Sequence, residues 1–127
     1  FCTNIKQSYI IEPTITQHLI DCVNEKPISL IGLPAEDVNF PYVDEVWLFN
    51  ILQHTINPDL IIKKAKKSAK VIRFFEPIEA GIDECHLHEF TLDFFKKHFG
   101  ECVKYYAPHT VEKDFHQHQC AYGVYTT

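Results

Sequence analysis

Short apolar runs alternate with amphipathic stretches along the chain, and this alternation predicts an α/β protein with parallel strands. The runs predicted to be strands are residues 8–12, 28–33, 43–50, 71–75, 102–107 and 119–125. Residues 46–49 are apolar at every position, which is typical of a central strand covered on both faces. The last two runs are separated by a short polar segment, so we predict that they pair antiparallel.

Apolar residues recur at helical spacing in the stretches between these runs. Thr14 begins a Thr-x-x-Gln capping box, which predicts a helix over residues 15–23. An Asn-Pro-Asp sequence predicts the start of a second helix, which runs over residues 57–68, because it combines a cap, a first-turn proline and an acid. A third helix is predicted over residues 91–99, and Gly100 stands where a C-cap glycine belongs.

Composition narrows the class of protein. Of the 127 residues, 46% are hydrophobic and 23% are charged, which is the balance of a globular domain rather than a disordered chain. The formal charge of −5 argues against a nucleic-acid partner. No apolar stretch approaches the roughly 18 residues of a membrane span. We therefore expect one domain over residues 1–127 with no nucleic-acid or membrane partner, and the sequence leaves its oligomeric state open.

The cysteines bear on the cellular compartment. There are five of them, at irregular spacings and without a C-x-x-C pair. The first nine residues lack the apolar segment of a secretory signal. We therefore expect reduced thiols and a cytoplasmic protein.

Several segments, taken in order, resemble one known family. They are YIIEP at 9–13, GLPAEDVNF at 32–40, VDEVWLFNILQH at 43–54, the helix start at 57–59, FEP at 75–77 and HEFTLDFFKKHF at 88–99. Together they resemble the class I S-adenosylmethionine-dependent methyltransferases that act on small molecules. The resemblance implies a Rossmann-like three-layer sandwich, with a mostly parallel sheet and a C-terminal antiparallel hairpin. Its sheet order would be 3-2-1-4-5-7-6.

The same resemblance implies roles for particular residues. The cofactor would be S-adenosylmethionine, with the Glu12 carboxylate on its ribose hydroxyls. Its adenine would lie against Ala35, Glu36 and Asp37, and Asn50 would also contact the cofactor. His54 would be the catalytic base for a hydroxyl acceptor, because imidazole titrates near neutrality. The substrate-binding residues would be Glu76, His86 and His88.

The chain departs from the family pattern at three places. No G-x-G occurs, Pro34 stands where an adenine-contacting acid is usual, and Ser68-Ala69 replaces a pair of glycines before a strand. The first strand of the family, which carries the glycine-rich loop, has no counterpart in the sequence. We therefore expect an N-terminally incomplete methyltransferase domain that binds the cofactor weakly by itself.

Two other clusters admit ligand-binding interpretations. Cys85 with His88, and the stretch from His116 through His118 to Cys120, contain residue types that bind zinc, but their spacings fit poorly and we expect no metal. The lysines at 63, 64, 66 and 67 favour a solvated helix face, with a phosphate-binding patch as the alternative.

Three functional hypotheses follow. The leading one is methyl transfer from S-adenosylmethionine to a small-molecule acceptor. The second is another Rossmann-like nucleotide-binding enzyme that uses Glu12 on a ribose. The third is a non-catalytic interaction domain with a degenerate methyltransferase fold, which Pro34 and the missing glycine loop support.

Overall fold

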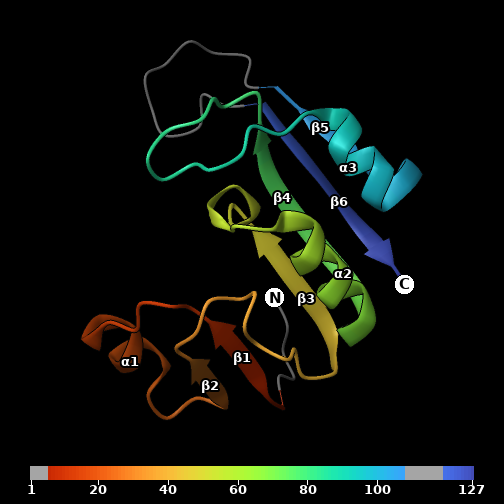
Figure 1. The fold of residues 1–127 in the computed structure, drawn as a ribbon. Coiled ribbons are helices and arrows are strands. Elements are labelled where there is room, and N and C mark those ends of the chain that lie inside the picture. Colours follow the sequence, from red (N-terminus) through yellow and green to blue (C-terminus); the bar gives the residue numbers. More distant parts are fainter. Residues whose placement is uncertain (1–5, 108–118) are drawn as a thin grey trace. The chain divides into compact units, whose positions relative to one another are not determined.

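The computed structural model describes residues 6–107 and 119–127 (Figure 1). The chain divides into two compact units, Phe1–Asn39 and Phe40–Thr127, which we call the N-terminal and the C-terminal unit.

The N-terminal unit is a parallel pair of strands joined through a helix. Strand β1 (Ser8–Ile11) pairs with β2 (Ile28–Ile31), and α1 (Gln17–Val23) connects them. The N-cap of α1 is Thr16, whose hydroxyl accepts the Leu19 N–H at 3.2 Å, so the predicted cap at Thr14 was two residues early. None of the α1 residues is buried.

The C-terminal unit contains a four-stranded sheet in the order β3-β4-β6-β5. The bounds of its strands are β3 (Val43–Phe49), β4 (Ala69–Ile78), β5 (Lys104–Tyr106) and β6 (Gln119–Thr126). Strand β3 is parallel to β4, and β6 is antiparallel to both β4 and β5. The predicted antiparallel pairing of the last two strands is therefore confirmed.

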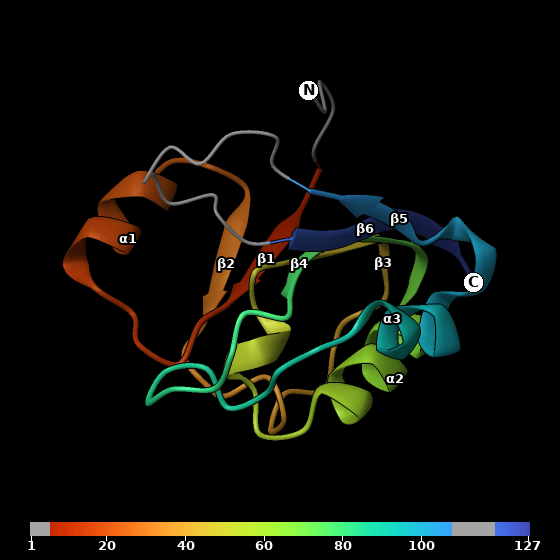
Figure 2. The ribbon, with the colours of Figure 1, turned by 90° about the horizontal axis from the view of Figure 1, so that it is seen from above.

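Helices α2 (Pro58–Ser68) and α3 (Leu92–Phe99) cover one face of this sheet (Figure 2). Alternate residues of β4 point toward them, and Phe74 is only 1% exposed. The Phe74 ring stacks on Phe95 and Phe99 of α3, with ring centroids 5.8 and 4.4 Å apart. From α2, Ile61 and Ala65 complete the core. These apolar contacts fix β4, and with it the loop that follows.

The helix ends in this unit follow the sequence signals. The Asn57 side chain accepts the Leu60 N–H at 3.0 Å and caps α2, as predicted. Gly100 ends α3 with a φ of 66°, a conformation that glycine adopts without a steric penalty. The predicted C-cap is therefore confirmed.

The expected Rossmann-like three-layer sandwich with a mostly parallel sheet is wrong. The described strands form two separate sheets, and two of the three ladders in the larger one are antiparallel. The two parallel pairs among the described strands are each joined through a helix, α1 in one and α2 in the other. The second side of β4 is instead occupied by β6, which runs in the opposite direction.

The prediction for residues 46–49 was also wrong. Among the described strands, β3 pairs only with β4. Trp47 and Phe49 are 55% and 50% exposed on the face that the helices leave open. Phe75, opposite Phe49 in the register, is 42% exposed on the same face. A continuous apolar run therefore does not mark a strand covered on both faces here.

Candidate functional site

The loops that follow β3 and β4 meet at one edge of the sheet. Because these strands are parallel, with Phe49 opposite Phe75, their carboxyl-terminal ends lie together. The Leu87 N–H donates to the Gln53 carbonyl oxygen at 2.8 Å and joins the two loops. Three imidazoles, at His54, His86 and His88, lie in these loops, and we call them the histidine cluster. The structure thus brings together most of the predicted catalytic and substrate-binding residues.

Glu76 of β4 holds the backbone of the loop that follows β3. Its side chain is fully buried, and its carboxyl oxygens accept the N–H groups of Ile51 and Leu52 at 3.0–3.3 Å. Burial raises the pKa of Glu76 to about 7, while the two backbone N–H groups act in the opposite direction. In this position Glu76 holds the loop, whereas the sequence predicted that it binds substrate.

His54 ends the short 3-10 helix Leu52–His54, and a hydrogen bond fixes its ring. Its Nδ1 lies 2.7 Å from the Cys85 carbonyl oxygen. A carbonyl can only accept, so in the neutral ring Nδ1 carries the proton and Nε2 has the free lone pair. The side-chain amide of Gln53 lies 3.4 Å from this Nε2 and donates to it. The exposed ring therefore presents a basic nitrogen.

His86 is held by Asp83, a residue that no sequence motif singled out. Asp83 Oδ2 lies 2.8 Å from His86 Nδ1, and Oδ1 accepts the backbone N–H groups of Cys85 and His86 at 2.7 and 2.8 Å. These hydrogen bonds lower the pKa of Asp83 and keep its carboxylate ionised. The signal was available, because Asp side chains commonly accept N–H groups two and three residues further along.

His88 has the opposite proton arrangement. Its Nε2 lies 2.8 Å from the Thr55 carbonyl oxygen, so Nε2 carries the proton in the neutral ring. Its ring stacks on Phe90, which is buried. His88 therefore connects the second loop to the core. His54 and His86 are the members of the cluster whose Nε2 atoms carry no proton, and the Nε2 of His54 accepts a 3.4 Å hydrogen bond from the Gln53 amide.

Asn50 lies at the turn that leads from β3 into the first loop. It has a φ of 55°, in the left-handed region that Asn tolerates better than most residues. Its N–H donates to the Phe75 carbonyl at 2.9 Å, and its Oδ1 accepts from the Gln53 amide at 2.8 Å. The exposed side chain is thus at the same sheet edge as the histidine cluster.

The remaining predicted cofactor residues belong to the N-terminal unit. The Glu12 N–H donates to the Ile31 carbonyl at 3.1 Å, so Glu12 follows β1 at the edge where β2 ends. Residues 35–37 follow β2, with Ala35 and Glu36 half-buried and Asp37 exposed. Within this unit, the structure places Glu12 and residues 35–37 after the carboxyl ends of neighbouring parallel strands.

One oxygen of the Glu12 carboxylate can accept a further hydrogen bond. The carboxylate is half-buried, and its Oε1 accepts the Thr14 N–H at 3.0 Å. No hydrogen bond from the described residues reaches Oε2. An ionised carboxylate accepts several hydrogen bonds, so a hydroxyl donor can be added at this oxygen.

Within residues 6–107 and 119–127, no three His, Cys, Asp or Glu side chains gather as metal ligands would. Cys85 and His88 lie in the second loop without a third ligand. His116 and His118 lie outside the described residues. In the described part of the chain, the helices are too short and too polar for any of them to cross a membrane.

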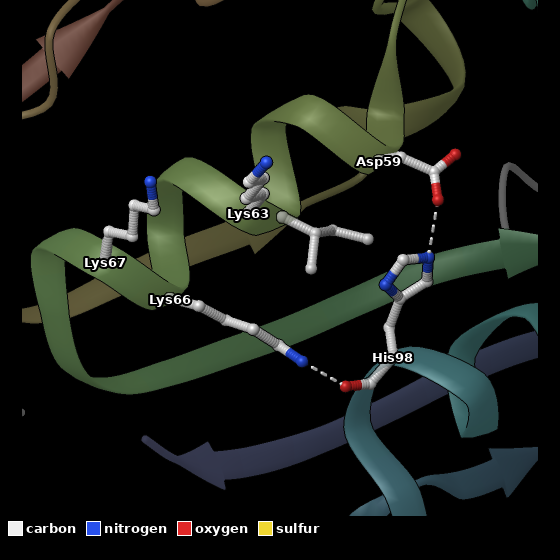
Figure 3. A pocket seen from close by; sticks show the side chains of 6 residues that line it. Asp59, Lys63, Lys66, Lys67 and His98 are labelled. Carbon is white, nitrogen blue, oxygen red and sulfur yellow. Dashed lines mark hydrogen bonds and ion pairs between the residues drawn. The ribbon is translucent and has the colours of Figure 1, made fainter.

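A basic groove lies along α2 beside His98 of α3 (Figure 3). Lys66 donates to the His98 carbonyl oxygen and lies over the rings of Phe99 and Tyr125. His98 Nε2 lies 2.9 Å from Asp59 Oδ1 in an ion-pair contact, and desolvation by burial lowers the pKa of His98. These polar groups contact one another and join α3 to α2, which favours a structural role over a phosphate site.

Comparisons with known proteins do not assign the chain to a class. No protein-family model matches it, and a search of the curated proteins returns no relative.

Proposed function

We propose that this chain transfers a methyl group from S-adenosylmethionine to a small-molecule acceptor in the cytoplasm. One observation carries the proposal furthest. A carbonyl contact fixes the His54 ring so that Nε2 is its basic nitrogen, at a sheet edge where the loops after two parallel strands meet. The motif resemblance around residues 43–54 supports the same reaction class.

The cofactor, when bound, supplies a methyl group on a positively charged sulfur. Glu12 would hold its ribose through Oε2, and residues 35–37 would lie against the adenine. These residues position the ligand, which is the larger part of what a protein contributes to such a displacement.

His54 handles the proton of the acceptor. A hydroxyl is a poor nucleophile while it keeps its proton, and His54 Nε2 accepts that proton as the oxygen reacts. The Cys85 carbonyl keeps the proton on Nδ1 and holds the ring in place. The imidazolium then returns the proton to water. Glu76 supports this step by fixing the backbone of Ile51 and Leu52, which precede His54 in the same loop.

Calorimetric titration with S-adenosylhomocysteine tests the proposal. We expect weak but saturable binding, and Glu12→Gln should weaken it about 10-fold or more, because hydrogen bonds to a charged acceptor contribute about 1.5–3 kcal/mol. Asp21→Asn is the matched control, since it removes a carboxylate from α1 of the same unit and should leave the affinity unchanged. No saturable binding at millimolar ligand would overturn the proposal. Equal binding by the Glu12 variant would remove Glu12 from the site.

A further inference from the structure

We propose that His86 is a second proton acceptor of this site and that Asp83 is its positioning residue. The inference rests on the proposed function, and it assigns His86 a chemical role where the sequence predicted substrate binding alone. The ligand it implies is a small molecule with a hydroxyl group, whose proton His86 Nε2 accepts and later releases to water.

The hydrogen bonds of Asp83 determine where the His86 ring lies and which of its nitrogens carries the proton. Oδ1 accepts the N–H groups of Cys85 and His86, which holds the backbone turn. Oδ2 lies 2.8 Å from His86 Nδ1 and takes the hydrogen bond of the ring. A carboxylate that accepts from Nδ1 keeps the proton there, so Nε2 is left as the acceptor. In many enzymes a histidine that acts as a base is oriented in this way, by a carboxylate that accepts from its Nδ1.

The neighbours of His86 place this base at the site already described. Its ring centroid lies 5.0 Å from that of His54, and the two rings are tilted by 49°. The His86 side chain is 29% exposed, and no hydrogen bond from the described residues reaches its Nε2. Two imidazoles with unprotonated Nε2 atoms thus lie side by side, and that of His54 accepts a 3.4 Å hydrogen bond from the Gln53 amide. The third, His88, donates from its Nε2 to the Thr55 carbonyl.

A purely structural role for Asp83 makes a different prediction from a positioning role. If Asp83 only closed the turn, its loss would affect the loop backbone and leave the proton position on His86 unchanged. Glu84→Gln is the matched control, because it removes the adjacent exposed carboxylate from the same loop. Amide shifts of β4 and β6 then report whether each variant keeps the fold.

Nitrogen-15 NMR of the imidazoles in the whole chain decides between these roles. At a pH where the rings are neutral, we expect the His86 proton on Nδ1, and Asp83→Asn should reduce the population of that form while Glu84→Gln does not. Acylation by diethyl pyrocarbonate should be faster at His86 than at His88, and Asp83→Asn should slow it several-fold. A proton on Nε2 in the native chain, or an Asp83→Asn variant without effect on either readout, would overturn the inference.

The same samples separate this inference from the methyl-transfer proposal. Absence of S-adenosylhomocysteine binding, with the His86 results as expected, overturns the reaction class and supports the proton acceptor. Binding of the ligand together with an Nε2 proton on His86 supports the reaction class and overturns the role of His86.

Discussion

The two units of the chain differ sharply in how they are packed. In the N-terminal unit, Val38 is the only buried side chain among the described residues, and the whole of α1 remains accessible. In the C-terminal unit, β4 buries alternate side chains against two helices, and Phe74, Phe95 and Ile72 are at most 1% exposed. The predicted ribose and adenine residues lie in the first unit, and the proton-accepting imidazoles lie in the second. The proposed base His54 therefore belongs to a unit with a well-packed core, whereas the predicted cofactor residues belong to a unit with little buried surface.

This contrast has a simple physical origin. A two-stranded sheet with one helix buries little apolar surface, and units below about 40 residues rarely hold together by a hydrophobic core alone. The sheet of the C-terminal unit has four strands and a stacked aromatic core. We therefore expect the free energy of unfolding to be carried almost entirely by the C-terminal unit.

Truncation of a core aromatic gives the largest expected effect. Phe95 is fully buried between Phe74 and Phe90. Phe95→Ala should lower the free energy of unfolding by about 3–5 kcal/mol, because it removes buried surface and leaves a cavity. Leu19→Ala in α1 should change the main unfolding transition by less than about 0.5 kcal/mol. Urea unfolding followed by circular dichroism measures both, and similar losses in the two variants would contradict the contrast.

The pH dependence of stability should come largely from Glu76. Its pKa is raised from 4.5 to about 7 in the folded chain, so the folded state holds its proton more tightly than the unfolded state does. The stability from this group is full below pH 4.5 and declines as the pH rises until it is lost above about 7. A difference of one between the folded and unfolded pKa corresponds to about 1.4 kcal/mol, so the loss amounts to about 3 kcal/mol.

Urea unfolding at a series of pH values isolates this contribution. The wild-type chain should lose stability between pH 4.5 and about 7 relative to Glu76→Gln, which cannot ionise. Glu101→Gln, an exposed acid of the same unit, is the control and should follow the wild type. Parallel pH curves for the wild type and the Glu76 variant would show that Glu76 does not titrate in this range.

Removal of equivalent helix caps should give a smaller effect. Thr91 caps α3 by accepting the Phe94 N–H, and Thr16 caps α1 by accepting the Leu19 N–H. Thr91→Ala should lower the free energy of unfolding by about 1 kcal/mol. Thr16→Ala should leave that free energy nearly unchanged and only increase hydrogen exchange in α1. Equal losses would mean that α1 unfolds together with the core.

Local signals in the sequence predicted much of the secondary structure. The cap at Asn57 and the glycine at Gly100 were identified because each conformation requires a particular residue type. The start of α1 was placed at Thr14 instead of Thr16, since either threonine can cap and only the observed hydrogen bond distinguishes them. Sequence alternation identified the strands but could not specify that β6 occupies the second side of β4.

The candidate site was predictable in part for similar reasons. His54 and His86 follow predicted strands. Because parallel strands end at a common edge of the sheet, both residues could be predicted to lie at the site. Asp83 was missed because its contact with His86 depends on a loop turn rather than on any periodic pattern. The burial of Glu76 was missed because the predicted strand ended at Phe75, whereas β4 continues to Ile78 and the adjacent loop folds over Glu76.

The proton position on His54 tests the central claim most directly, because His54 can act as the base only if its Nε2 carries no proton. A long-range nitrogen-15 correlation spectrum of the folded chain, recorded where the ring is neutral, reports which nitrogen carries the proton. We expect the proton on Nδ1, in its hydrogen bond to the Cys85 carbonyl. A proton on Nε2 would contradict the proposed base and the site built around it.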